Sequence, residues 1–294
     1  YYGYGQGRVY PDQTPLDKVF RDLNVLPDFK SNVDSLLFIH RKLSDGDLYF
    51  ISNQSGRKKN FNASFRVSGF QPELWNPQTA EIRLLPQYQE HSQTTEVPME
   101  LQPFESAFIV FRIPSYGVRK QAGENYPLSQ FRMTVAGPWK VTFQEKRGGP
   151  EGPVVMDSLS DWTRSSDERI KYFSGEAAYT TSFEMKKLPE GEIYLDLGKV
   201  MVMAKVKLNG HYIGGVWTSP YRLNITKYLR KGENQLEVTV VNDWMNRLIR
   251  DKSLPEQDRI TWQTCSDLKA DTPLQSSGLL GPVKIQSYPY RMLR

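Results

Sequence analysis

The sequence has few of the residues on which disulfides, thiolate metal sites and histidine chemistry depend. Its 294 residues contain one cysteine, Cys265, and three histidines. A single cysteine excludes an intrachain disulfide and a metal site built from several thiolates. The Gly-x-Ser-x-Gly elbow of many serine hydrolases is also missing. We therefore expect that the chain requires no cofactor.

Long apolar runs and basic clusters are missing as well. Runs such as 107–111 are far shorter than the roughly 18 residues that cross a bilayer, and no secretion signal opens the sequence. The net charge is +5, but 38 Lys and Arg are interleaved with 33 Asp and Glu, and the densest basic run, 57–59, is short. We expect neither membrane insertion nor a nucleic-acid partner.

Short segments of alternating polarity, separated by turn residues, fill most of the sequence. This pattern predicts an all-β chain of two antiparallel β-sandwich domains with a short N-terminal connector helix. The expected parts are a connector at 1–30, an immunoglobulin-like sandwich at 31–114, a linker at 115–130 and a jelly-roll domain at 131–294. No βαβ succession appears, so a catalytic (β/α)₈ barrel is not expected within these residues.

The connector helix is predicted from a stripe of apolar residues with helical spacing. Thr14 is the expected N-cap, Pro15 the first helical residue, and the stripe runs to Leu26 before Pro27 ends the helix. One amphipathic helix cannot bury its own apolar stripe. We expect it to pack on the next domain or on a domain outside this sequence.

The segment 204–251 is the most informative of the chain. Asn209-Gly210 predicts a two-residue hairpin turn, and the loops that follow carry aromatic and forked polar side chains of the kind that bind sugars. The carbohydrate-binding candidates are Trp217, Tyr221, Arg222, Trp244, Asn246 and Arg247. The alternative interpretation is that these residues pack the rim and stabilise loops. Trp139 and Trp162 are expected in the core.

Glycoside hydrolysis needs two carboxyl groups at a defined separation. The nominal candidates are Asp157, Asp161, Asp167, Glu168, Asp243 and Asp251. None belongs to a motif that forces pairing, so we interpret them as turn caps and solvated charges and assign no catalytic residue. Loop carboxylates and carbonyls leave room for a structural Ca²⁺, whose ligands the sequence does not specify.

A series of short motifs adds a family resemblance. They are GQGRVY (5–10), DLYFISN (47–53), ELWNP (73–77), GPW (137–139), LSDW (159–162), KYFSG (171–175), LNG (208–210), NDWMNRLI (242–249) and SGLLGPV (277–283). In this order they resemble the C-terminal part of glycoside hydrolase family 106, the α-L-rhamnosidases and their relatives. Leu-Asn-Gly also recurs in the sugar-binding sandwich of family 2 enzymes. Arg250 departs from the pattern, which leads us to expect a glycine there.

The resemblance implies a non-catalytic region of a larger α-L-rhamnosidase-like glycosidase, ending in a galactose-binding-like jelly roll. Its implied partners are an upstream catalytic domain, which would bind Ca²⁺, and a plant-type oligosaccharide or polysaccharide that the enzyme degrades. It also implies a periplasmic or extracellular location. Two other hypotheses stay open: a freestanding carbohydrate-binding or adhesion module, and a catalytically complete hydrolase.

Overall fold

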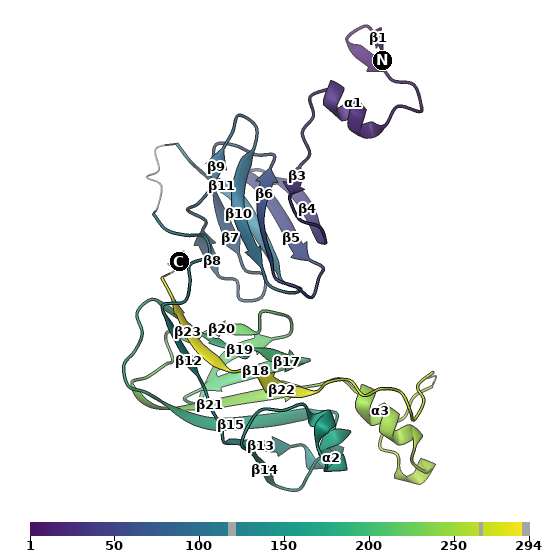
Figure 1. Cartoon of the computed structure of the whole chain (residues 1–294), viewed down its shortest axis with the longest axis vertical. Coiled ribbons are helices and arrows are strands. Elements are labelled where there is room, and N and C mark those ends of the chain that lie inside the picture. Colours follow the sequence, from purple (N-terminus) through teal and green to yellow (C-terminus); the bar gives the residue numbers. More distant parts are fainter. Residues whose placement is uncertain (117–121, 265–266, 290–294) are drawn as a thin grey trace. The chain divides into compact units, whose positions relative to one another are not determined.

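The computed structural model describes residues 1–116, 122–264 and 267–289 (Figure 1). Its elements are mainly strands in antiparallel sheets, so the predicted all-β fold class is confirmed. The chain divides into two compact units. The first comprises Tyr1–Asn76, Leu84–Leu101 and Ser106–Tyr126, and the second comprises Pro77–Arg83, Gln102–Glu105 and Pro127–Arg294.

The first unit begins with a small hairpin and one helix. Strands β1 (Tyr2–Tyr4) and β2 (Gly7–Val9) pair, and α1 (Leu16–Asp22) follows. The connector helix is therefore present, but both predicted ends are wrong. Pro15, not Thr14, is the N-cap, because Pro15 is itself extended at φ −58° and ψ 136° and disfavours a helical conformation at Thr14. The helix stops short of Leu26, since Asn24 is left-handed at φ 53°.

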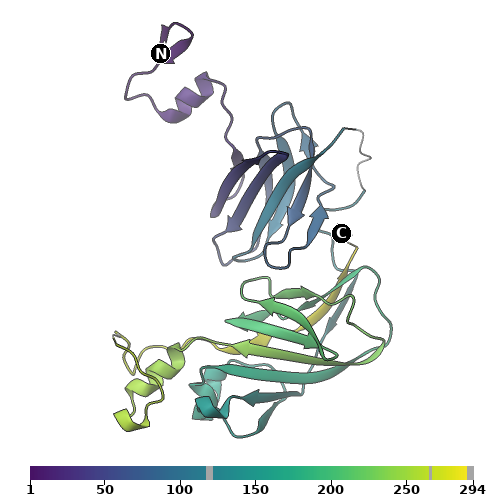
Figure 2. The ribbon, with the colours of Figure 1, turned by 180° about the vertical axis from the view of Figure 1, so that it is seen from behind.

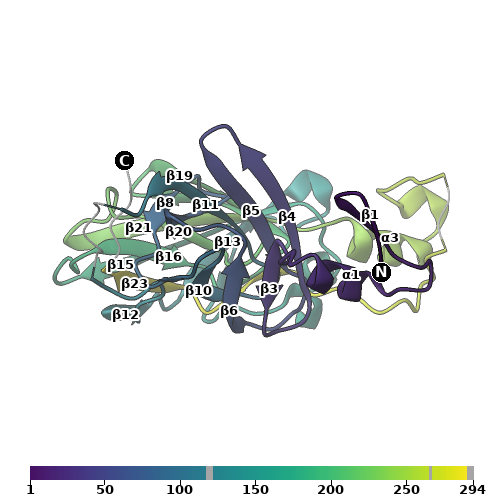
Figure 3. The ribbon, with the colours of Figure 1, turned by 90° about the horizontal axis from the view of Figure 1, so that it is seen from above.

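Two antiparallel sheets form the sandwich of the first unit. One has the order β3 (Phe29–Ser31), β6 (Lys59–Phe65), β10 (Thr95–Leu101), β9 (Gln89–Glu90). The other has the order β4 (Leu36–Leu43), β5 (Gly46–Asn53), β11 (Ser106–Pro114), β7 (Phe70–Trp75), β8 (Ile82–Leu84). Figure 3 shows β4 and β5 side by side. Tyr49, Phe65 and Phe111 meet in the core between these sheets.

Part of the predicted linker packs on the first unit. Asn125 is buried, accepts a hydrogen bond from the Gln87 N–H at 2.8 Å and donates one to the Gln87 carbonyl at 2.7 Å. Residues 117–121 of the predicted linker lie outside the described residues.

The two main sheets of the second unit have six and four strands (Figure 2). The six-stranded sheet has the order β14 (Pro153–Met156), β13 (Trp139–Phe143), β15 (Glu176–Met185), β21 (Gly232–Val241), β18 (Met203–Leu208), β19 (His211–Val216). The four-stranded sheet has the order β12 (Phe131–Thr134), β23 (Lys284–Tyr288), β16 (Glu192–Asp196), β20 (Arg222–Asn224). A short pair, β17 (Lys199–Met201) and β22 (Gly278–Gly281), completes the strands of this unit.

Helical pieces sit in the loops of the second unit. They are α2 (Glu168–Lys171), α3 (Met245–Lys252) and the 3₁₀ turns η1 (Glu145–Arg147), η2 (Trp162–Arg164) and η3 (Glu256–Asp258). In Figure 1, α3 projects beyond the end of the six-stranded sheet.

The register of the six-stranded sheet aligns one end of the domain. Phe143, Ala177, Val240, Ala204 and Val216 are cross-strand partners in a single row, and all five are buried. Strand β15 pairs antiparallel with both β13 and β21, and β18 pairs antiparallel with both β21 and β19. Strands β13, β21 and β19 therefore run in the same direction. The segments that leave these three strands therefore start at the same end of the sheet.

The predicted Asn-Gly hairpin is confirmed between β18 and β19. Asn209 and Gly210 have φ of 54° and 80°, as a two-residue turn with positive φ at both positions requires. The Asn209 side chain also donates to the Tyr228 carbonyl and to Asn234 Oδ1, both at 2.9 Å. The turn is thus tied to two neighbouring loops.

A buried hydrogen bond between aromatic residues anchors the core of the second unit. Trp162 Nε1 donates to the Tyr179 hydroxyl oxygen at 2.5 Å, and the Leu279 N–H donates to the same oxygen at 3.2 Å. Burial raises the pKa of Tyr179 to about 12. Trp139 and Trp162 are both buried, so their expected place in the core is confirmed.

We predict that Gly278→Ala is clearly more destabilising than Gly232→Ala. Both glycines have positive φ, which costs an L-residue about 1–2 kcal/mol. A Cβ at Gly278 would lie 2.5 Å from Trp162 Nε1, whereas a Cβ at Gly232 would meet nothing within 4 Å. The clash adds about 1–3 kcal/mol, which urea unfolding of the two variants measures. Equal losses would contradict the packing described for Trp162.

Candidate functional site

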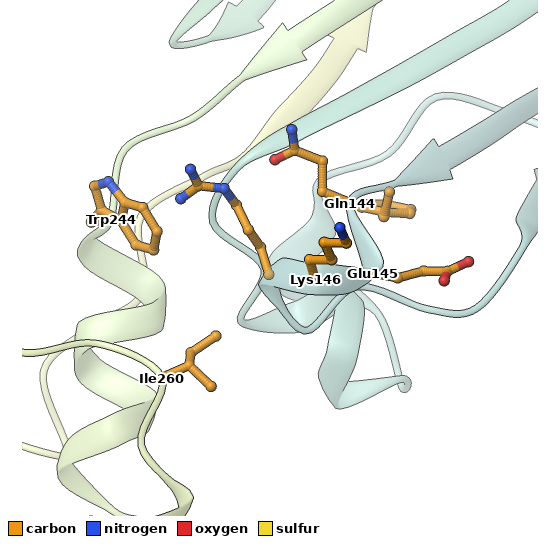
Figure 4. A pocket seen from close by; sticks show the side chains of 7 residues that line it. Gln144, Glu145, Lys146, Trp244 and Ile260 are labelled. Carbon is orange, nitrogen blue, oxygen red and sulfur yellow. The ribbon is translucent and has the colours of Figure 1, made fainter.

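An open pocket lies at the end of the six-stranded sheet where β13, β21 and β19 finish, called the aligned end below. Its volume is about 690 Å³, and it is lined by Phe143, Gln144, Glu145, Lys146, Arg147, Trp244 and Ile260. These residues come from the end of β13, from η1, from the start of α3 and from the segment after η3. Figure 4 shows Trp244 and Ile260 on one side and Gln144, Glu145 and Lys146 on the other.

A stacked pair joins the two sides of this pocket. The guanidinium carbon of Arg147 lies 4.9 Å from the centroid of the Trp244 ring, within the range of a cation–π contact. Trp244 is 43% exposed, so about half of its surface remains open to a ligand. Gln144 is tied to the sheet, because its Oε1 accepts a hydrogen bond from the Glu176 N–H at 3.1 Å.

The basic residues of the pocket are free of acidic partners. Within the described part of the chain, Lys146 and Arg147 have neither an ion pair nor a hydrogen bond from the side chain. Glu145, the one carboxylate among the described lining residues, accepts a hydrogen bond from the Gly152 N–H at 3.1 Å. The pocket therefore offers two positive charges to a ligand.

A buried ion pair holds the wall that carries Ile260. Arg247 Nη2 lies 2.7 Å from Asp251 Oδ1, one helical turn further along α3. The other oxygen, Asp251 Oδ2, accepts hydrogen bonds from the N–H groups of Ile260 and Thr261 at 3.2 and 2.8 Å. Gly148 is left-handed at φ 79°, and a Cβ there would lie 3.5 Å from both Arg247 Nη1 and Ile260. The pocket wall is thus positioned by α3.

Asn246 lies beneath the pocket rather than in its lining. It is fully buried, donates to the Gln275 carbonyl at 2.7 Å and to Ser277 Oγ at 3.0 Å, and accepts from the Gln275 N–H at 2.8 Å. These bonds fix the start of α3 to the segment 275–277. Of the predicted sugar-binding residues on α3, Trp244 lines the pocket, whereas Asn246 and Arg247 hold the helix that presents it.

The other predicted loop lies apart from this pocket. Trp217 is 56% exposed at the aligned end of the sheet, and Tyr221 packs against the core, where burial raises its pKa. The Arg222 guanidinium stacks over the rings of Tyr194 and Tyr288, at 4.9 and 5.4 Å from their centroids. The described lining of the pocket includes none of the 217–222 side chains, so the structure does not bring the six candidates into one site.

The carboxylates considered for catalysis have structural partners. Asp161 and Asp167 are N-caps of η2 and α2. Glu168 accepts a hydrogen bond from Arg250 at 2.6 Å, and Asp243 accepts one from the Met245 N–H at 3.0 Å. Asp157 is exposed. Arg250, where the family pattern leads us to expect a glycine, lies within α3 and does not have a positive φ, so its backbone is not strained.

Among the described residues, no group of three or more His, Cys, Asp or Glu side chains is arranged to hold a metal ion. None of the described helices combines the length and apolarity needed to cross a bilayer. Cys265 lies outside the described residues.

Known families match both parts of the chain. Residues 2–90 match the model of glycoside hydrolase family 106, described as alpha-L-rhamnosidase. Residues 160–273 match the galactose-binding domain-like model of glycosyl hydrolase family 2. The chain is therefore related to glycoside hydrolases and carries a galactose-binding-like domain, as its motifs predicted.

Two individual proteins show the same relationship to glycoside hydrolases. The structure of a rhamnosidase from Novosphingobium sp. PP1Y matches with a TM-score of 0.80 and 36% identity, covering 92% of this chain and 26% of that one. A Formosa agariphila protein, provisionally named a beta-glucuronidase, is 38% identical over 179 residues, which are 52% of this chain and 15% of that protein. This chain thus spans a small part of the length of the relatives that it matches.

We predict that Asp161 stabilises the segment 275–277 in its ionised form. Burial alone would raise the pKa of Asp161, but hydrogen bonds from Ser276, Ser277 and Thr163 outweigh it and lower the pKa. The folded pKa is below the unfolded value of about 4, so this stability is present above pH 4 and is lost as pH falls through the folded pKa. Asp161→Asn should cost about 1–2 kcal/mol at pH 7 and less at pH 3.

Urea unfolding at both pH values measures this difference. Asp157→Asn, at an exposed aspartate, is the matched control and should change stability little at either pH. A cost for Asp161→Asn that is the same at pH 7 and pH 3 would contradict the role of the charge.

Proposed function

We propose that the chain is a non-catalytic β-sandwich region of a larger glycoside hydrolase, in which it supports the catalytic domain and helps to hold the carbohydrate. By the same proposal the whole enzyme hydrolyses α-L-rhamnosyl bonds of a plant-type saccharide outside the cytoplasm. A structural Ca²⁺ remains part of the proposal, with no ligand assigned. The likeness to a rhamnosidase over 92% of this chain but 26% of that enzyme supports it most directly.

The exposed apolar surface of the N-terminal segment favours a supporting role. Helix α1 buries no residue, and it leaves Leu16, Phe20 and Leu23 between 46% and 71% exposed. The preceding hairpin exposes Tyr2 and Tyr4 in the same way. Several exposed apolar side chains on one short segment favour contact with another protein surface. These residues fall within the match to the rhamnosidase family, so we assign that surface to the catalytic domain.

A freestanding carbohydrate-binding module is the second candidate function. The observation that favours it is the open pocket with the half-exposed ring of Trp244. This role requires affinity of the chain alone for a saccharide, whereas the supporting role does not. The supporting role and the carbohydrate-binding role are compatible if the region both docks on the catalytic domain and binds a saccharide.

We predict that Phe20→Ser with Leu23→Ser destabilises the longer enzyme but not this chain by itself. In the chain alone both side chains are about half exposed, so the change in stability should stay within about 0.5 kcal/mol. In the longer enzyme, loss of two buried side chains should cost about 3 kcal/mol or more. Thermal unfolding of both proteins measures the effect.

The matched control is Leu188→Ser, which changes an exposed leucine of the second unit. It should be neutral in both proteins. An equally small effect of the α1 substitutions in the longer enzyme would contradict the docking role. A coding sequence with no further domain would contradict the proposal as a whole.

A further inference from the structure

The pocket at the end of the six-stranded sheet combines features that select an anionic, ring-shaped ligand. Lys146 and Arg147 are exposed and have no acidic partner in the described part of the chain. The third nearby cation, Arg247, is neutralised by Asp251 at 2.7 Å. Glu145 is the single carboxylate in the described lining, and it bonds to the Gly152 N–H. The charge left for a ligand is therefore positive.

The stacked position of Arg147 leaves its hydrogen-bonding edge available. A guanidinium that lies over an aromatic ring uses its flat face, while its N–H groups point outward in its own plane. That edge matches the two oxygens of a carboxylate, and the resulting bidentate pair is among the stronger hydrogen-bonded contacts in proteins. Stacking on Trp244 also restricts the Arg147 side chain, so less entropy is lost on binding.

Apolar surface lies beside these charges. Trp244 and Ile260 are 43% and 50% exposed on the wall opposite Lys146 (Figure 4). An aromatic ring of this kind packs against the C–H face of a pyranose, while the adjacent basic groups reach its substituents. A ligand that satisfies both requirements has a sugar ring and a carboxylate.

The supporting structure makes this a preorganised pocket. Asp251 fixes Ile260 through the backbone, Asn246 fixes the start of α3, and Gln144 is bonded to the Glu176 N–H of the sheet. All three anchors act from buried or half-buried positions. The walls of the pocket are thus held independently of any ligand.

We propose that this pocket binds a hexuronate unit of an acidic oligosaccharide. Arg147 and Lys146 bind its carboxylate, and Trp244 packs against its ring. The inference rests on the proposed function, because it names the class of carbohydrate that this region would hold.

Isothermal titration calorimetry of the whole chain with three probes tests it. The probes are trigalacturonate, the neutral galactose trimer with all carboxylates reduced, and a sulfated galactose trimer. Trigalacturonate should bind saturably and more weakly at higher salt, and the other two should bind at least about tenfold more weakly. Equal binding of the neutral or sulfated trimer, or no binding of trigalacturonate, would overturn the proposal.

Variants locate the site. Arg147→Gln and Trp244→Ala should each weaken trigalacturonate binding about tenfold or more. The affinity of Arg147→Lys should lie between those of the wild type and Arg147→Gln, because lysine keeps the charge but lacks the forked guanidinium. Lys187→Gln and Trp217→Ala are the controls: an exposed lysine and an exposed tryptophan outside the pocket lining. Both should bind like the wild type.

Thermal unfolding of each variant shows that it is folded. Wild-type affinity in folded Arg147→Gln, or a loss in the Trp217→Ala control equal to that in Trp244→Ala, would contradict the proposed site. Because titration of the chain alone does not depend on docking, its failure leaves the proposed supporting role intact. A failure of the docking test likewise leaves this inference standing.

Discussion

The hydrogen-bonded register of the six-stranded sheet is the constraint on which the candidate site depends. It aligns Phe143, Val240 and Val216, the last or nearly last residues of three strands that run in the same direction. A one-residue slip would turn every side chain of a strand to the opposite face, so the buried pattern fixes the alignment. The segment with Lys146 and Arg147 and the segment with Trp244 therefore leave the sheet at the same end.

Buried polar groups convert this alignment into a defined pocket. Ser277 is a shared partner: its N–H donates to Asp161 Oδ1 at 3.0 Å, and its Oγ accepts from Asn246 and Asn242. Asp251 likewise accepts hydrogen bonds from the backbone N–H groups of Ile260 and Thr261. Because an unsatisfied buried polar group is costly, these bonds restrict loops that have little regular structure of their own. The position of Trp244 thus follows from residues that lie outside the pocket lining.

The fold could be predicted from the sequence because its signals are local. Alternating residues marked the strands, Asn209-Gly210 marked a hairpin, and Trp139 and Trp162 are buried as expected. The ends of α1 were wrong because the conformations of Pro15 and Asn24 outweigh the apolar periodicity. Such conformations depend on one or two residues and leave little trace in a pattern.

The candidate site could be predicted only in part. Trp244 was identified by its residue type, but Lys146 and Arg147 follow a different strand, and their place beside Trp244 depends on the strand order. Asn246 and Arg247 have the polar groups of a sugar-binding site, yet their hydrogen bonds and ion pair join parts of the chain that are distant in sequence. A local signal of the pocket was the basic pair Lys146-Arg147, which follows β13 after Gln144 and Glu145 and precedes Gly148-Gly149.

The most direct test of the central proposal is the turnover of an aryl α-L-rhamnoside by the purified chain and by the longer enzyme. We predict release of the aryl group by the longer enzyme and none by this chain at high concentration over long incubation. Turnover by the chain alone that disappears on substitution of a single Asp or Glu would contradict a non-catalytic role.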